Sequence, residues 1–392
     1  MHGFEYFVPT EIVFGAGSTE KLPELLKKRG LSRVLVVYGS SSAKKSGLLD
    51  RVFRLLDEAG VQYRALGGVE ADPRAAREGV QLALESGAEL ILAVGGGSVI
   101  DTCKAIAHGA ANPGTDIWEF WKRRAPLTRS MPVGVVLTIP AAGSETSDSA
   151  VLTNAEAGEK RGLTPPFTRP AFAILDPLLA ATLPVHQVAC GVSDILMHTL
   201  DRYFNPVTDN ALTDELAEAL LRVVLEYGPA AVRDAHDETA MSEIMWAGSL
   251  SHNGLTGLGG RKDFATHQLG HALSEKFDVY HGDSLTAVWS SWARSVMDES
   301  PARFARFARN VWHVGEAGDT AAALAGIARQ EAFFQSIGMP VRLGELSCGK
   351  QDEAGLADLA SRCSYGKTRT IGTFRVLDYE SILAIYRRAN EA

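Results

Sequence analysis

The first half of the chain alternates short apolar runs with longer stretches of helical periodicity. Four runs rich in β-branched residues, each bounded by glycine or proline, are typical of buried strands, and helix-like segments separate the first three. They read RVLVVYGS, ELILAVGGG, PVGVVLTIP and PAFAILDP, within residues 33–177. This alternation predicts an α/β domain with a parallel sheet and helices on both faces.

Strand signals stop near residue 183, and helical patterns continue to the end. The clearest helical patterns are residues 214–228, 301–314 and 319–338. We place a boundary near Leu183-Pro184, since a proline that follows the last strand can begin a helix. The prediction is an α/β domain at 1–182 and an all-helical domain at 183–392, because a chain of 392 residues is too long for one ordinary core.

Composition narrows the class of partner and the compartment. The net charge is −8 and the basic residues are dispersed, which argues against nucleic acid or an anionic membrane and favours a small-molecule partner. The four cysteines lack CxxC spacing, so we expect reduced thiols rather than disulfides. Without a signal-like N-terminus or an apolar run of about 18 residues, the expected location is the cytoplasm.

A glycine-rich turn between a strand and a helix is a candidate phosphate site. Gly95, Gly96, Gly97 and Ser98 end the second apolar run, and Asp101 falls in the helix that follows. Glycines let a phosphate approach the backbone, and the helix N-terminus offers unpaired N–H donors and a favourable dipole. The turn lacks GxGxxG spacing, so a tight turn that binds nothing stays open as an alternative.

The end of the first apolar run bears on which dinucleotide would bind. An NAD-selective chain often carries an acidic residue here for the ribose 2′-OH, whereas residues 39–42 read Gly-Ser-Ser-Ser and Lys44 and Lys45 follow. Serine hydroxyls, backbone amides and a nearby lysine suit a 2′-phosphate. The pattern favours NADP(H) over NAD(H), with a solvated turn as the alternative.

Histidines and an aspartate cluster at spacings typical of metal ligands. Asp194 and His198 lie four residues apart in a helical pattern, His267 and His271 repeat that spacing, and His281 follows. Nitrogen and oxygen donors suit Fe²⁺ or Zn²⁺, although satisfied structural histidines remain possible and the absence of HExxH argues against a zinc peptidase. The remaining histidines are treated as structural: His2, His108, His186, His236, His252 (which could line the same cleft) and His313.

An ordered set of motifs covers nearly the whole chain. It includes FVPTEIVFGAG, GGGSVID, TIPAAGSETS, GVSDILMHTLDRYF, DFATHQLGHALS and YHGDSL. The set resembles the iron-containing (group III) alcohol dehydrogenases, and within them the butanol dehydrogenase-like branch of NADPH-dependent aldehyde reductases. The resemblance implies the dehydroquinate synthase-like fold of that family, an N-terminal dinucleotide-binding domain followed by a helical metal-binding and substrate domain.

The resemblance also implies roles for residues at matching motif positions. One divalent ion, Fe²⁺ or Zn²⁺, would be held by Asp194, His198, His267 and His281, and His271 would be a catalytic residue near the nicotinamide that relays a proton. The implied activity is hydride transfer between NADP(H) and short to medium-chain alcohols or aldehydes, with the metal as Lewis acid, in a homodimer. The implied cofactor contacts are Gly39, Ser40, Ser41, Gly96, Gly97, Ser98, Asp101, Thr138, Ser144 and Lys160.

Some features depart from the family pattern or leave alternatives. Asp283 and Ser284 stand after the last proposed ligand where relatives often have apolar or small residues, which puts substrate preference in doubt. A dehydroquinate synthase-type lyase that uses NAD and a non-catalytic metal- or nucleotide-binding protein remain competing readings. The segment 5–14 could pair with a second subunit or form a hairpin within the chain.

Overall fold

The computed structural model describes residues 1–39, 42–207 and 209–391. Its contacts group into two units. The N-terminal unit comprises Phe7–Leu183 and Ala235–Ser249, and the C-terminal unit comprises Met1–Tyr6, Pro184–Asp234 and Leu250–Ala392. Each unit thus combines segments from both sides of the predicted boundary at 182/183. The division of the chain into two domains stays a prediction.

A six-stranded sheet forms the centre of the described part of the N-terminal unit. Its order is β1-β8-β5-β4-β2-β3, and every neighbouring pair is parallel. The predicted α/β fold class is therefore confirmed. The strands are β1 (Glu11–Phe14), β2 (Arg33–Tyr38), β3 (Gln62–Gly67), β4 (Leu90–Gly95), β5 (Val133–Leu137) and β8 (Phe172–Leu175), and an antiparallel pair, β6 (Ala150–Asn154) and β7 (Glu159–Leu163), lies outside the sheet.

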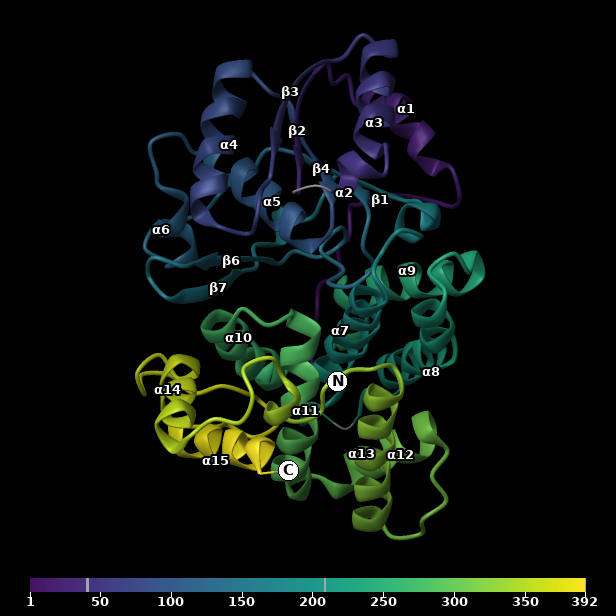
Figure 1. The fold of residues 1–392 in the computed structure, drawn as a ribbon, viewed down its shortest axis with the longest axis vertical. Helices are drawn as coiled ribbons and strands as arrows, with labels where there is room; N and C mark the ends of the chain where they lie inside the picture. Colours follow the sequence, from purple (N-terminus) through teal and green to yellow (C-terminus); the bar gives the residue numbers. More distant parts are fainter. Residues whose placement is uncertain (40–41, 208, 392) are drawn as a thin grey trace. The chain divides into compact units, whose positions relative to one another are not determined.

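Helices pack against both faces of this sheet (Figure 1). On one face, α3 buries a stripe of five aliphatic residues at helical spacing against strands β2 and β4. Each such side chain contributes about 1.5–3 kcal/mol when fully buried. The helices of this unit are α1 (Leu22–Lys28), α2 (Ser42–Lys45), α3 (Leu48–Glu58), α4 (Pro73–Ser86), α5 (Gly97–Ala111), α6 (Ile117–Trp121) and most of α9 (Glu238–His252).

The strand order creates a switch point between β2 and β4. From β2 the chain continues to β3 at one edge of the sheet, whereas from β4 it continues to β5 on the other side. In open α/β sheets, ligands bind outside the carboxyl ends of the strands at such a point. Gly39 follows β2 there, and the glycine-rich turn follows β4.

The described part of the C-terminal unit is helical, apart from an isolated bridge between Ile371 and Leu377. Helix α7 begins directly after Pro184 and is buried along nearly its whole length among α8, α10 and α11. Residues on several of its faces can therefore meet side chains from neighbouring helices. The helices are α7 (Val185–Tyr203), α8 (Ala211–Arg233), α10 (Ala265–Phe277), α11 (His281–Val296), α12 (Pro301–Trp312), α13 (Asp319–Ser336), α14 (Glu353–Cys363) and α15 (Tyr379–Asn390).

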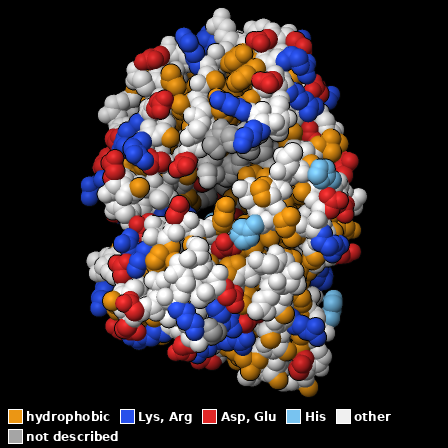
Figure 2. All heavy atoms as spheres, viewed as in Figure 1, with side chains coloured by type: hydrophobic (Ala, Val, Ile, Leu, Met, Phe, Trp, Pro, Cys, Tyr) orange, Lys and Arg blue, Asp and Glu red, His pale blue; other side chains and the backbone are white. Residues whose placement is uncertain are grey.

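The structure also bears on the predicted pairing of segment 5–14 and on the distribution of charged side chains at the surface. Residues 1–10 form no strand, and β1 pairs in parallel with β8, so the hairpin alternative for segment 5–14 is wrong. Acidic and basic side chains are interspersed on the face shown in Figure 2. Among the described residues, no helix combines the length and apolar character needed to cross a bilayer.

Candidate metal and cofactor sites

Four side chains converge inside the C-terminal unit around one carboxylate oxygen. Asp194 and His198 extend from the same face of α7, His267 comes from α10 and His281 is the first residue of α11. Asp194 Oδ1 lies 3.5 Å from His198 Nδ1 and 3.6 Å from Nε2 of both His267 and His281. Asp194, His267 and His281 each offer a ligand atom within 4.8 Å of the others.

These distances are typical of ligand atoms that surround one cation, and they are too long for good hydrogen bonds between the side chains. Ligands about 2.1 Å from a tetrahedral ion are about 3.4 Å apart, whereas a good N–H···O bond is shorter. Asp194 Oδ1, His198 Nδ1 and His267 Nε2 are buried and have no hydrogen-bond partner among the described residues. Leaving such atoms unsatisfied costs about 1–3 kcal/mol each, so the cluster suits a divalent ion that would satisfy them together.

A second aspartate on α7 orients one of these histidines. Asp201 is fully buried, and its Oδ2 lies 2.5 Å from Nδ1 of His267. Histidines that ligate metals typically donate their other ring nitrogen to a carboxylate in this way. Sequence reasoning missed Asp201, although its place seven residues after Asp194 puts it on the same helical face.

The environment shifts the pKa values of two histidines in opposite directions. Burial holds the pKa of His198 well below its usual range, and the neighbouring His252 and His267 add to this. Burial also opposes charge on His267, but the neighbouring carboxylates of Asp194 and Asp201 prevail and raise its pKa to about 9. A cation would therefore meet a neutral His198 and would displace a proton from His267.

Two further histidines flank the cluster. The ring of His271 lies 5.4 Å from that of His281 and 6.3 Å from that of His267. The ring of His252, treated as structural from sequence, lies 4.0 Å from that of His198. His281 is 31% exposed, whereas the other three proposed ligands are about 5% exposed, so the accessible side of the cluster lies at His281.

The glycine-rich turn of the N-terminal unit has the features expected of a phosphate site. Gly96 precedes α5 in an extended conformation, and no side chain caps the helix. A Cβ on Gly96 would approach Ile139 to 3.2 Å, and one on Gly97 would approach Ala142 to 3.1 Å. The glycines thus allow the loop that follows β5 to pack closely against the glycine-rich turn. The exposed Ser98 and the first backbone amides of α5 stay available to an anion.

Asp101 and Ser144 lie together, but they bond within the protein. Ser144 Oγ donates to Asp101 Oδ1 at 2.5 Å, and the amide of Val151 donates to Oδ2 at 2.9 Å. Buried Lys104 donates to the carbonyls of Ser144 and Ser149. These contacts give Asp101 a role in anchoring the 144–151 segment, and its direct contact with a cofactor stays a prediction.

The other proposed cofactor contacts are distributed along the same unit. Thr138 directly follows β5, and its amide donates to Gly95 in the glycine-rich turn. Lys160 lies on β7, and Gly39 follows β2 at the switch point. Ser40 and Ser41 lie outside the described residues.

A parallel sheet with an uncapped helix at its switch point suits a dinucleotide, and the aspartate–histidine cluster of the helical unit suits a divalent metal. This combination is typical of metal-dependent dehydrogenases. Comparison with known proteins specifies which one. The chain belongs to the iron-containing alcohol dehydrogenase family, since the family model "Iron-containing alcohol dehydrogenase" matches residues 9–177 and the model of the C-terminal part, "Fe-containing alcohol dehydrogenase family, C-terminal", matches residues 187–390. It is therefore an enzyme of alcohol and aldehyde oxidoreduction, and the family implies a nicotinamide cofactor and a divalent metal.

Individual relatives agree with this assignment over the whole length. The probable NADH-dependent butanol dehydrogenase 1 of Bacillus subtilis is 38% identical over 99% of each chain. The NADPH-dependent aldehyde reductase YqhD of Escherichia coli is 35% identical over 88% of this chain and 89% of its own. The crystal structure of NADH-dependent butanol dehydrogenase A from Thermotoga maritima superimposes with a TM-score of 0.95 at 30% identity, covering 100% of this chain and 99% of that one.

Proposed function

We propose that this enzyme reduces short to medium-chain aldehydes with NADPH, and oxidises the corresponding alcohols, with one Fe²⁺ or Zn²⁺ held by Asp194, His198, His267 and His281. The observation that carries the proposal is that one ring nitrogen from each of the three histidines lies 3.5–3.6 Å from Asp194 Oδ1. Of these atoms, Asp194 Oδ1, His198 Nδ1 and His267 Nε2 are buried and have no hydrogen-bond partner among the described residues. Without a bound ion, these buried polar atoms would have no interaction to offset the cost of removing them from water.

The chemistry divides between the bound groups and the chain. When bound, the ion supplies a Lewis acid for the substrate oxygen and the nicotinamide supplies the hydride. Asp194 would supply a negatively charged ligand for the ion, and Asp201 fixes the His267 ring so that Nε2 points into the cluster. His271 lies on the accessible side, next to His281, and exchanges a proton with the substrate oxygen.

The preference for NADPH rests on the end of β2. Gly39 carries no side chain that could repel a 2′-phosphate, and the exposed ammonium of Lys44 lies 5.3 Å from the centre of the Tyr38 ring at the end of the same strand. Relatives carry names of both NADH-dependent and NADPH-dependent enzymes, so this preference is the more specific part of the proposal.

The deciding experiment combines metal analysis with turnover in two variants. Purified protein should contain one of the two metals and oxidise NADPH only when an aldehyde is present. His267→Ala should lose both metal and turnover, whereas His271→Ala should keep the metal and turn over slowly. Metal retention in the first variant, or metal loss in the second, would contradict the assigned roles.

The same assay separates the competing readings. A lyase of the dehydroquinate synthase type would show no net oxidation of NADPH, because its dinucleotide is regenerated within each turnover. A non-catalytic binding protein would bind metal and dinucleotide without aldehyde-dependent turnover. Either pattern would replace the reductase proposal.

Two further parts of the proposal concern assembly and location. We propose a homodimer that works in the cytoplasm. Several large apolar side chains near the N-terminus are exposed in the single chain and support a subunit contact there, namely Phe4, Tyr6, Phe7 and Phe14. Light scattering on the purified protein measures the assembly directly, and a monomer would remove that part of the proposal.

A further inference from the structure

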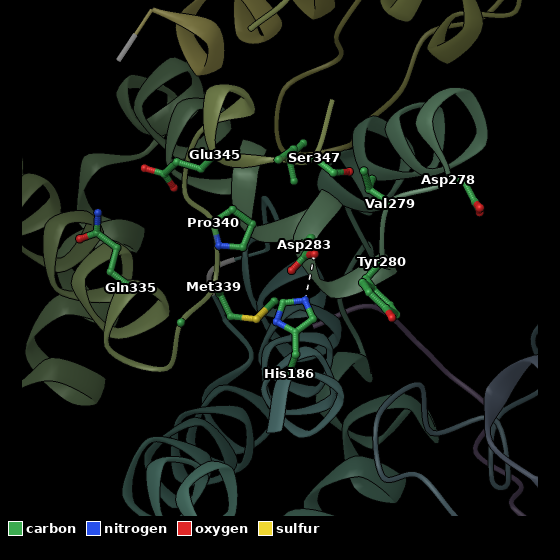
Figure 3. A pocket seen from close by; sticks show the side chains of 12 residues that line it. His186, Asp278, Val279, Tyr280, Asp283, Gln335, Met339, Pro340, Glu345 and Ser347 are labelled. Carbon is green, nitrogen blue, oxygen red and sulfur yellow. Dashed lines mark hydrogen bonds and ion pairs between the residues drawn. The ribbon is translucent and has the colours of Figure 1, made fainter. Parts of the chain in front are cut away.

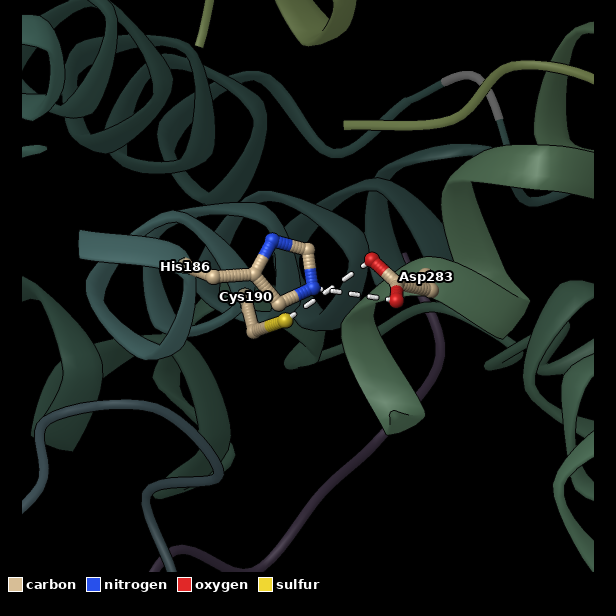
Figure 4. A group of neighbouring side chains, drawn as sticks. All are labelled: His186, Cys190 and Asp283. Atoms are coloured by element: carbon tan, nitrogen blue, oxygen red, sulfur yellow. Dashed lines mark hydrogen bonds and ion pairs between the residues drawn. The ribbon is translucent and has the colours of Figure 1, made fainter. Parts of the chain in front are cut away.

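Helix α7 carries potential metal ligands for about two turns before Asp194. His186 and Cys190 precede Asp194 at intervals of four residues, so all three lie along the same face of the helix. Figure 4 shows the side chains of His186 and Cys190 directed toward Asp283, which comes from the first turn of α11. The same two helices therefore bring together two sets of donors.

The donor atoms of this second set are close enough to share one ion. Asp283 Oδ2 lies 3.0 Å from His186 Nε2, and Oδ1 lies 3.9 Å from Cys190 Sγ. One ligand atom from each residue lies within 4.8 Å of the others. Around an ion with Zn–S near 2.3 Å and Zn–N near 2.0 Å, such atoms would be about 3.5 Å apart, so small side-chain rotations suffice.

Close contact between the two helices makes this arrangement possible. A Cβ on Gly282 would lie 2.7 Å from Cys190 Cα and 2.9 Å from the Cys190 carbonyl oxygen. Only a residue without a side chain allows the first turn of α11 to approach the backbone of α7 this closely. Asp283, the next residue, is thereby placed within reach of His186 and Cys190.

The cluster opens into a cavity. A pocket of about 560 Å³ within the C-terminal unit is bordered by His186, Asp283, Tyr280, Met339 and Glu345 among others. In Figure 3 the side chains of His186, Asp283 and Met339 lie next to one another at this pocket. His186 is 43% exposed and Asp283 is 14% exposed, so solvent reaches the donors from the pocket side.

We propose that His186, Cys190 and Asp283 bind a second divalent cation of the Zn²⁺ class, with one coordination position open to the pocket for water or a small anionic ligand. Imidazole, thiolate and carboxylate together suit Zn²⁺ and are poorly suited to Mg²⁺ or Ca²⁺, which take oxygen ligands. On binding, the Cys190 thiol releases its proton to solvent as the sulfur–metal bond forms.

The site is distinct from the one proposed for catalysis, but the two share a structural element. Asp283 follows His281 by two residues in the first turn of α11. An ion held by Asp283 and α7 therefore fixes the turn that presents His281.

Co²⁺ is the probe that distinguishes the two sites. Thiolate-to-Co²⁺ charge transfer produces a near-ultraviolet band, which the Asp194 cluster cannot produce because its donors are nitrogen and oxygen only. Titration of metal-stripped wild-type protein with Co²⁺ should produce this band, and a His267→Ala variant should retain it. The proposal is thus tested separately from the catalytic function.

Variants of the second cluster complete the test. Cys190→Ser should abolish the band, and His186→Gln, which keeps the thiol, should weaken Co²⁺ binding as read from the same band. Cys348→Ser, which changes another partly exposed cysteine of the same unit, should leave the band unchanged. Absence of the band in the wild type, or its persistence in Cys190→Ser, would overturn the proposal.

Discussion

The Asp201 carboxylate lies 2.5 Å from Nδ1 of His267, and both side chains are buried in the C-terminal unit. This pairing places the ring proton on Nδ1 and leaves Nε2 as the atom that faces Asp194, at 3.6 Å. The orientation of a proposed ligand is therefore set by a residue that is not itself among the proposed ligands.

Replacing this carboxylate should weaken metal binding without removing a ligand. We expect Asp201→Asn to lower metal affinity by about 10–100-fold, because the ring of His267 loses its fixed orientation and its basicity. Competition with a chelator measures the change, and activity should recover at saturating metal. Asp319→Asn, which alters an exposed ion pair with Arg309, serves as the control. Unchanged affinity in Asp201→Asn would show that the contact has no part in metal binding.

A methyl group at Gly282, which is not itself a proposed ligand, should disturb the cluster around Asp194. The added Cβ would meet the Cys190 backbone at 2.7 Å, so the first turn of α11 must move away and carry His281 with it. We expect Gly282→Ala to lose turnover and metal affinity, with about 1–3 kcal/mol lower stability from overpacking.

The matched control for this change is Gly315→Ala, since a Cβ there meets nothing within 4 Å. It should behave as the wild type in activity, metal content and unfolding midpoint. Equal behaviour of the two alanine variants would refute the role given to the close helix contact.

A carboxylate at the end of β2 should reverse the preference between dinucleotides. A Cβ on Gly39 would lie 3.5 Å from Val99, an ordinary contact, so Gly39→Asp fits without displacing the backbone. Repulsion between the new charge and a 2′-phosphate should raise KM for NADPH by roughly tenfold or more, given about 1–4 kcal/mol for like charges 4 Å apart. KM for NADH should change much less, and an equal rise for both dinucleotides would indicate that the 2′-phosphate lies elsewhere.

His108 should make the protein sensitive to mild acid. Burial, with a smaller effect from Lys104, lowers the pKa of His108 from 6.5 to about 3. The unfolded chain therefore binds a proton between pH 6.5 and 3 that the folded chain does not, so stability present above pH 6.5 is lost as the pH falls. The contribution of His108 to the slope approaches about 1.4 kcal/mol per pH unit below pH 6.5.

The measurement is the denaturant midpoint of metal-stripped protein between pH 6.5 and 5, before most carboxylates titrate. His108→Gln should flatten the slope, because the amide can still bond to Ser130 and Thr168 without gaining a charge. His2→Gln, at an exposed position, should leave it intact. An unchanged slope in His108→Gln would assign the acid sensitivity to other groups, such as His198.

The sequence predicts those parts of the molecule whose signals are local. The buried strands β2, β4, β5 and β8 are continuous apolar runs, and Asp194 and His198 show their shared face through a four-residue interval. Strand β3 was missed because it lies at the edge of the sheet, where most of its side chains are exposed and its pattern is polar.

Contacts between distant segments carry no such signal. Asp283 meets His186 across 97 residues, which is why His186 was read as structural even though Cys190 follows it at the same four-residue interval. Likewise, the family resemblance places Asp101 at the cofactor, which stays a prediction, but nothing in the sequence reveals that Ser144 and Val151 donate hydrogen bonds to its two oxygens.

Because His186, Cys190, Asp194, His198 and Asp201 all extend from α7, their mutual angles are set by the pitch of a single helix. One residue inserted between Cys190 and Asp194 would rotate the donors on either side of it by about 100° relative to each other. Substitution can therefore alter either cluster while the other persists, but an insertion between them would leave at most one donor set in register with its partners on α11.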